Sequence, residues 1–300
     1  MVPNMKGPNL KVRARTFVAA FPLLGLLALG LLTFRAAAQP APPAAKPEMI
    51  ENCPGLVAGG PLLKPVAYRP PALQAASLAG DQVRISYSGH STFLIESPGG
   101  VKIATDYNDY VKPRVLPDIV TMNHAHSTHY TDHPDAGIAH VLRGWGPSPD
   151  KPARHDVQFR DVRVRNVPTN IRTWGGETER HGNSIFIFEI ANLCIAHLGH
   201  LHHTLTQQQL NEIGRIDAVM VPVDGGVTLD FEGMAEVLQA LKAPLMIPMH
   251  YFSTYSLRRF LDTLGEKSVQ VEMSDVSSVV VSKTTLPDKP KLLVLPGRAF

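Results

Sequence analysis

The chain has 300 residues and a formal net charge of +3, with 44% hydrophobic and 18% charged residues. Residues 1–38 contain five basic side chains and no acidic one, so the rest of the chain has a net charge of −2. A slightly acidic domain has too little positive charge to bind nucleic acid by counterion release, and a chain this apolar is not disordered. The composition therefore predicts one sizeable folded domain, with no nucleic acid as partner.

The first segment has the parts of an export signal. Basic residues precede the apolar run 17–34, and Ala36-Ala37-Ala38 supplies small residues before Gln39. We expect residues 1–38 to be a cleaved signal peptide and the mature protein to be periplasmic or secreted. An uncleaved anchor is the alternative, because the apolar run is just long enough for a short membrane span. Residues 39–80, rich in Pro and Ala, are predicted to form an extended arm before a domain at 81–300.

Alternating apolar residues predict a series of strands in the first half of this domain, and strands that alternate with helices in the second half. The early strands are expected at 83–87, 92–95, 101–105, 119–122, 157–159, 162–167, 185–190 and 193–196. Helices are expected from a Thr206 capping box to Gly214, over 231–241 and from a Ser256 cap to Gly265, with strands at 216–221, 245–248, 269–273, 279–281 and 292–295. This order favours an α/β fold in which helices cover two sheets in four layers, α/β/β/α.

Histidines are concentrated just after predicted strands. Eight of the 13 lie in two windows, and one more follows the strand at 245–248: His124, His126, His129, His133, His197, His200, His202, His203 and His250. His124 and His126 are two positions apart on an extended segment, so both rings can reach one ion, and His129 can approach it after a turn. Loops at strand ends often carry functional groups, and imidazole nitrogen suits zinc and related transition metals. We therefore predict a metal site rather than a polar surface loop.

Five motifs carry a family resemblance: Ser88-Gly89-His90-Ser91-Thr92, Thr105-Asp106, His124-Ala125-His126-Ser127-Thr128-His129, Ala196-His197-Leu198-Gly199-His200 and Pro248-Met249-His250-Tyr251. In order and spacing they resemble the metallo-β-lactamase superfamily of metal-dependent hydrolases, and more narrowly its ascorbate-6-phosphate lactonase-like branch, from about Val83 to His250. The resemblance implies the family's four-layer αβ/βα sandwich, a metal-activated water and hydrolytic activity.

The ligand set departs from the family pattern. Thr128 stands at the acidic position of H-x-H-x-D-H, and His200 stands where an aspartate usually follows Leu-Gly. The loop 167–174 lacks the family's histidine, and His181 is a displaced candidate for it. Two divalent ions about 3.5 Å apart would repel by roughly 19 kcal/mol at an effective dielectric constant near 20, and neutral imidazoles do not offset that charge.

We therefore predict a single ion, with zinc as first choice and iron, manganese and copper as alternatives. The expected ligand pool is His124, His126, His129, His200 and His250. The ion lies either in the His124/His126 half or in the His129/His250 half of the site, and His200 can join either half.

Residues near the histidines have a structural and a functional interpretation. Thr128 can donate a hydrogen bond but cannot act as a general base near neutral pH. Asp106 either orients a ligand histidine or caps a turn. His90 is expected to be structural, and for His197 both roles stay open. His202 and His203 either line the entrance or begin the helix at 206.

Four arginines, a glycine loop and two cysteines complete the candidates. Arg160, Arg163, Arg165 and Arg172 form either a rim for an anionic substrate or, as we favour, a solvent-facing surface. Asp224-Gly225-Gly226 predicts a tight loop near the pocket, and it lacks the Lys-Ser/Thr of a phosphate loop. Cys53 and Cys194 can pair after export, or Cys194 is a buried and inert thiol.

We expect an exported metal-dependent hydrolase that attacks an ester, lactone, amide or phosphodiester of a small-molecule substrate with a metal-bound water or hydroxide. A non-catalytic metal-binding or sensing protein on the same scaffold is the alternative, and redox or dioxygen chemistry at a histidine-only iron or copper site is a third hypothesis. No membrane partner is expected unless the signal stays uncleaved, and the oligomeric state is left open.

Overall fold

The structure is a computed structural model that describes residues 77–297 except 125, 149, 174 and 266–268. The expected signal peptide and nearly all of the expected arm lie outside the described residues, as does Cys53. Cys194 is fully buried, and its pairing with Cys53 stays a prediction. In the described part of the chain, no helix is long and apolar enough to cross a membrane.

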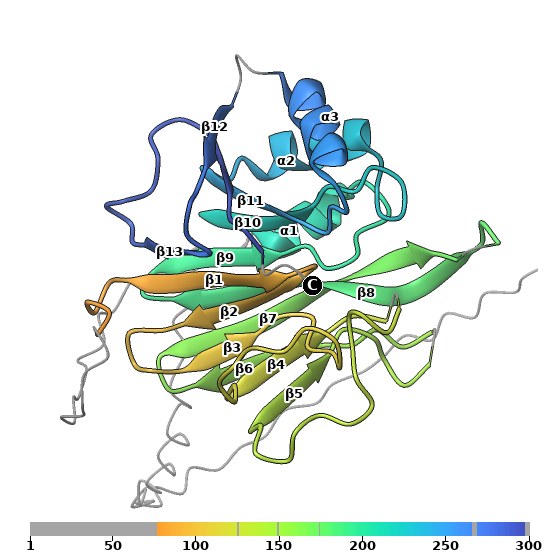
Figure 1. The fold of residues 1–300 in the computed structure, drawn as a ribbon. Coiled ribbons are helices and arrows are strands. Elements are labelled where there is room, and N and C mark those ends of the chain that lie inside the picture. Colours follow the sequence, from red (N-terminus) through yellow and green to blue (C-terminus); the bar gives the residue numbers. More distant parts are fainter. Residues whose placement is uncertain (1–76, 125, 149, 174, 266–268, 298–300) are drawn as a thin grey trace, which may run out of the picture. The chain divides into compact units, whose positions relative to one another are not determined.

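Two β-sheets form the framework (Figure 1). The first has six strands in the order β13-β1-β2-β3-β4-β5. Its strands are β1 (Val83–Gly89), β2 (Thr92–Glu96), β3 (Lys102–Ala104), β4 (Ile119–Met122), β5 (His140–Arg143) and β13 (Ser278–Val281). The second has eight strands in the order β12-β14-β11-β10-β9-β8-β7-β6. Its strands are β6 (Asp156–Phe159), β7 (Val162–Arg172), β8 (Thr178–Ile190), β9 (Leu193–His197), β10 (Ala218–Pro222), β11 (Leu245–Met249), β12 (Gln270–Met273) and β14 (Lys291–Val294).

Strand direction brings the candidate residues together. In the first sheet, β2 is antiparallel to β1 and to β3, whereas β3, β4 and β5 are mutually parallel. Strands β1, β3 and β4 therefore run the same way, and their carboxyl ends reach one edge of the sheet. In the second sheet, β9, β10 and β11 are also parallel. The loops that follow these strands carry nearly all the predicted site residues.

The alternation of side chains along β8 separates two hydrophobic cores. Phe186 and Phe188 point into the space between the sheets, and Ile185 and Ile187 point to the outer face of the larger sheet. This is the period of two that a strand buried on both faces requires.

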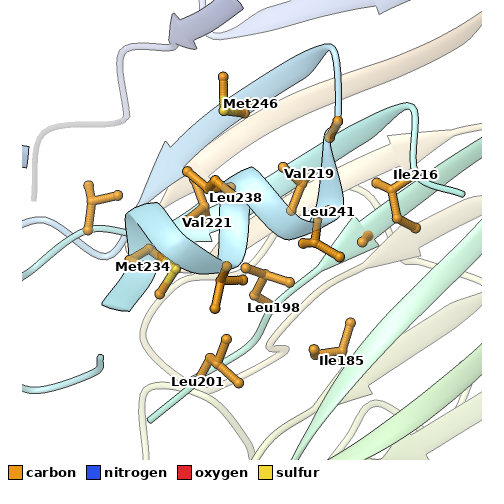
Figure 2. Packing of buried hydrophobic residues seen from close by; sticks show 14 of the residues in the cluster. Ile185, Leu198, Leu201, Ile216, Val219, Val221, Met234, Leu238, Leu241 and Met246 are labelled. Atoms are coloured by element: carbon orange, nitrogen blue, oxygen red, sulfur yellow. The ribbon is translucent and has the colours of Figure 1, made fainter. Parts of the chain in front are cut away.

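Helices cover the outer face of the larger sheet. They are α1 (Gln207–Ile213), α2 (Phe231–Leu241) and α3 (Thr254–Leu264). Figure 2 shows Met234, Leu238 and Leu241 of α2 beside Val219 and Val221 of β10, and all five belong to one buried cluster. Burial of such apolar surface, at about 25 cal/mol per Å², is what holds the helical layer on the sheet.

The predicted α/β sandwich of two sheets is confirmed, with three differences in detail. All helices of the described residues pack on the larger sheet, and loop residues such as Tyr130 and Trp145 cover the outer face of the smaller one. Strand β5 was not predicted, because only Leu142 of its residues is buried and no alternation marks it. The capping box at Thr206 is present, but α3 is capped by Ser253, whose side chain accepts from the Ser256 amide.

Candidate metal centre

The loop after β4 is a tight turn and not an extended segment. The His129 amide donates to the His126 carbonyl at 2.9 Å, and the Asn123 amide donates to the His129 carbonyl at 3.1 Å. Side chains two positions apart point the same way only on an extended strand. The turn therefore separates His124 from His126, although the sequence pattern predicted that they would act together.

His124 lies outside the histidine cluster. Its Nδ1 atom is 2.9 Å from Oε1 of Glu179, a residue of β8. The ring centroid lies 5.0 Å from that of Trp145 and 5.7 Å from that of Tyr130. In this structure His124 is thus held on the β8 side of the loop and is not directed at the other predicted ligands.

Four other histidine rings, from three loops, converge in one cluster. Single nitrogen atoms of His90, His126, His129 and His250 all lie within 4.8 Å of one another. The Nε2 atoms of His129 and His250 are 3.2 Å apart. A tetrahedral zinc with Zn–N bonds of about 2.0–2.1 Å requires ligand nitrogens about 3.3–3.4 Å apart, so this pair fits an ion. The sequence predicted a structural role for His90. Its position directly after β1 indicated that it could reach the cluster, because β1 and β4 end at the same edge of the first sheet.

Carboxylates hold two of these rings by their Nδ1 atoms. Asp106 Oδ2 lies 2.5 Å from Nδ1 of His129, and Asp224 Oδ2 lies 2.9 Å from Nδ1 of His250. An ionised carboxylate can only accept hydrogen bonds, so His129 and His250 each carry their proton on Nδ1. The Nε2 lone pair of each ring then faces the cluster. Asp224 was noticed in the sequence only as part of a tight loop, and its place after β10 would have identified it.

Thr128 supports the third ring. Its hydroxyl lies 2.7 Å from Nδ1 of His126 and 2.9 Å from Nε2 of His90. With the Nε2 lone pair of His126 turned to an ion, Nδ1 of that ring donates to Thr128, and the hydroxyl donates onward to His90. Thr128 thus takes a positioning role at the place where the family has an acidic residue.

His200 enters the cluster as a hydrogen-bond donor. The Arg172 amide donates to Nδ1 of His202 at 3.0 Å, so the proton of that neutral ring is on Nε2. This Nε2 lies 2.5 Å from Nδ1 of His200, which must accept and therefore carries its own proton on Nε2. His200 Nε2, 3.0 Å from Nε2 of His126, is then a donor and has no lone pair for a metal. The chain of bonds argues against the predicted ligand role of His200.

Burial favours the neutral form of His90, His129 and His200. Burial, helped by the neighbouring histidines, holds the pKa of His129 and of His200 well below the ordinary value of 6.5. Burial likewise lowers the pKa of His90 to about 4. Neutral imidazole is the form that binds a transition metal, and burial lowers the pKa of both His126 and His129, so these two rings fit such an ion at neutral pH.

The two carboxyl groups respond differently to their surroundings. Burial raises the pKa of Asp106, although hydrogen bonds from Asn123 and Ser91 act in the opposite direction. A bound cation would lower this pKa. Burial would also raise the pKa of Asp224, but hydrogen bonds from His250 and Thr228 hold it below the ordinary value of 3.8. Asn123, which donates to Asp106 at 2.9 Å, is a positioning residue that sequence reasoning missed.

Three of the eight non-glycine residues with positive φ in the described part of the chain lie at this site. His90, Asp106 and His250 have φ values of 54°, 43° and 55°, in the left-handed region that costs non-glycine residues about 1–2 kcal/mol. Such strain persists where the surrounding structure imposes it, and it is typical of functional sites.

A cavity of about 430 Å³ opens next to the cluster. Its wall includes His126, His200 and His202, the end of the β7–β8 hairpin with Arg172, and Gly226. The other histidines of the two sequence windows lie elsewhere. His197 donates from Nε2 to the Ser91 carbonyl at 2.9 Å and so links the two sheets, and His181 and His133 are outside the cluster.

Comparisons with known proteins agree with this architecture. The profile described as "Beta-lactamase superfamily domain" matches residues 84–250. A UPF0173 metal-dependent hydrolase of Thermoplasma acidophilum is 24% identical over 60% of this chain and 87% of its own length. A UPF0173 protein of Pyrococcus furiosus is 24% identical over 65% of this chain and 96% of its own. The crystal structure of a metallo-beta-lactamase superfamily protein from Thermotoga maritima has a TM-score of 0.53 at 26% identity, covering 72% of this chain and all of that one. None of these confirms the lactonase-like branch.

Proposed function

The chain belongs to the beta-lactamase superfamily and is a metal-dependent hydrolase, and on that premise we propose that it holds one divalent ion on the Nε2 atoms of His126, His129 and His250. The observation that carries this proposal is the shared orientation of the three rings. Each has its Nδ1 within hydrogen-bond distance of a partner, Thr128, Asp106 or Asp224, so each has a lone pair on Nε2. At His126 this lone pair accepts from Nε2 of His200 at 3.0 Å, and an ion would take the place of that hydrogen bond.

The hydrogen bonds that the two carboxylates already accept support a single ion. Asp106 accepts at both oxygens, from His129 and from Asn123. Asp224 accepts at Oδ2 from His250 and Thr228 and at Oδ1 from backbone amides such as that of Gly226. Neither carboxylate is left to bridge two ions, and their two negative charges match the charge of one divalent ion. A second ion would add uncompensated repulsion.

His126, His129 and His250 would hold a divalent ion, which would supply Lewis-acid chemistry: it would lower the pKa of water at the site to about 7 and polarise a scissile carbonyl or phosphoryl group. The protein orients the rings through Asp106, Asp224 and Thr128. His200 donates its Nε2 proton to Nε2 of His126 at 3.0 Å; an ion on His126 would replace this hydrogen bond and leave the proton to stabilise negative charge that develops on a reacting oxygen.

This arrangement supports hydrolysis of an ester, lactone, amide or phosphodiester, with zinc as the first candidate for the ion. The open cavity beside the rings favours an enzyme over a closed metal-binding or sensing site, because structural sites fill all positions with protein ligands. Export, and with it a periplasmic or secreted location, is supported by the pattern of residues 1–38 alone.

The test combines metal content with turnover of the purified full-length chain. We expect one equivalent of metal after dialysis and chelator-sensitive hydrolysis of at least one generic ester, lactone or phosphodiester. His126→Ala, His129→Ala and His250→Ala should each lose most of the metal together with activity. His200→Ala is the matched control, because it removes a ring of the same cluster but should keep the metal.

Two results would contradict the proposal. Two equivalents of metal that survive dialysis would exclude the single-ion site. Full metal content in the His126→Ala and His250→Ala proteins, with loss in His200→Ala, would show that another set of rings binds the ion. Stable metal with no turnover of any compound would favour the non-catalytic alternative.

A further inference from the structure

Four arginines were predicted to share one role, and the structure separates them. Arg163 binds Asp156 at 2.8 Å and lies 3.4 Å from Glu189, and Arg165 binds Glu189 at 2.9 Å. Arg160 lies over the ring of Phe159, with 5.2 Å to the centroid. Only the fourth, Arg172, is among the residues that line the cavity beside the histidines. The solvent-facing role favoured from the sequence fits Arg160 but not Arg163 or Arg165, whose side chains are largely buried. Arg172 is exposed, and it faces the cavity.

Arg172 lies at the end of β7 and is tied to the opposite wall. Its Nη2 donates to the Gly226 carbonyl at 3.1 Å and to the Thr228 carbonyl at 3.2 Å. These bonds fix the guanidinium plane without neutralising its charge. Among the described residues, Arg172 forms no ion pair with a carboxylate, and its Nε and Nη1 groups have no hydrogen-bond partner. The guanidinium thus offers three N–H groups to a ligand.

The rest of the wall agrees with a negatively charged ligand. His200, in the same wall, has its proton on Nε2 because His202 donates to its Nδ1. The one carboxylate of the described lining is Glu179, which faces His124 at 2.9 Å. Gly226, also in the lining, has no other atom within 4 Å of the position where a Cβ would lie.

We propose that this cavity binds an oxyanion group of the substrate, a carboxylate or a phosphate, on the free N–H groups of Arg172, beside the bond that is hydrolysed. A planar guanidinium matches both groups with paired hydrogen bonds. The substrate of the proposed hydrolase is therefore an anionic small molecule, such as a half-ester of a dicarboxylic acid or a phosphorylated ester. This inference rests on the proposed function for the reaction, but the binding step does not require turnover.

The first experiment measures equilibrium binding to the metal-loaded full-length protein. Glutarate and glycerol 3-phosphate are titrated calorimetrically, which distinguishes a carboxylate site from a phosphate site. We expect at least one of them to bind, Arg172→Gln to weaken that binding by about 10–100-fold, and Arg172→Lys to recover part of it because the charge stays. Arg160→Gln, which removes an exposed arginine outside the cavity, should bind as the wild type does.

The second experiment compares hydrolysis of methyl hydrogen glutarate with that of dimethyl glutarate, which differ by one charge. In each reaction water supplies OH to the acyl carbon, the acyl–oxygen bond breaks, and methanol leaves with the remaining proton. Arg172→Gln should raise KM for the monoanion about 10–100-fold and lower kcat/KM of the neutral diester much less.

The outcomes are distinguishable. Anion binding that does not change in Arg172→Gln would place the anion on the ion alone and overturn the inference. An equal loss for the neutral and the charged ester, or an equal loss in Arg160→Gln, would also overturn it, because the effect would then be structural. Failure of every ester to turn over, with Arg172-dependent anion binding retained, would contradict the hydrolase and leave the anion site supported.

Discussion

At the scale of single residues, the partners of the Nδ1 atoms decide what each histidine can do. A carboxylate behind His129 or His250 leaves a lone pair on Nε2, whereas the donor His202 behind His200 leaves a proton there. Rings that look equivalent in the sequence thus divide into metal ligands and a hydrogen-bond donor. The cause is the group behind each ring: a carboxylate can only accept a hydrogen bond, whereas the Nε2–H of His202 must donate one.

Thr128 gives a direct test of this logic. Thr128→Val keeps the shape of the side chain but leaves Nδ1 of His126 without its partner at 2.7 Å. We expect the affinity for zinc to fall about 10-fold, measured by competition with a chelator of known affinity, because loss of such a supporting bond typically costs 10–100-fold. Thr128→Ser retains the hydroxyl and should bind zinc as the wild type does. Unchanged affinity in Thr128→Val would mean that the hydroxyl does not position the ring.

At the scale of elements, the site depends on short loops that follow parallel strands. The loop after β9 passes between two asparagine side chains at Gly199, whose φ is 62°. A Cβ at this position would collide with the side-chain amides of Asn183 and Asn123. Asn183 accepts from the His200 amide at 2.8 Å, and Asn123 donates to Asp106. One glycine therefore lets two supporting residues approach the loop together.

Gly199→Ala should destabilise the protein by roughly 2–5 kcal/mol, since it adds steric overlap to the cost of a left-handed backbone. Gly100→Ala is the matched control, because Gly100 has a φ of 82° and open space around it, and it should lose only about 1–2 kcal/mol. Urea unfolding measures both. Equal losses of unfolding free energy in the two variants would show that the close packing around Gly199 adds no steric cost to the Gly199→Ala substitution.

At the scale of the whole molecule, the buried histidines link stability to pH. Burial lowers the pKa of both His90 and His202 to about 4 in the folded chain, from 6.5 when they are exposed. Between these values the unfolded chain binds more protons than the folded one, so stability rises with pH. The metal-free protein should keep its full stability above about pH 6.5 and lose it progressively as the pH falls toward 4. Asp106, whose pKa is raised in the folded chain, has the opposite effect on stability, but it is one group against two histidines.

Urea midpoints in the presence of a chelator, measured from pH 7 to pH 4, test this prediction. His202→Gln should show a smaller decrease across the range than the wild type, because one titrating group is gone. His133→Gln, at a histidine outside the cluster, should decrease in parallel with the wild type. A flat profile for the wild type would contradict the linkage.

The sequence by itself determined the fold class and the three loops of the site. Apolar alternation predicted most strands, because burial between layers requires that period, and His126, His129 and His250 each follow one of the predicted strands. The motif resemblance supplied the superfamily, which the match over residues 84–250 confirms.

Only the tertiary structure decided which nitrogen faces the site. The turn at 123–129 moves His124 to Glu179, and hydrogen bonds from residues distant in the chain set the proton on His200 and the orientation of His250. The same holds for Arg172, which lines the cavity, whereas Arg163 and Arg165 pair with carboxylates and Arg160 lies over Phe159. Ring orientation and proton position depend on contacts between loops, and residue order along one segment does not contain them.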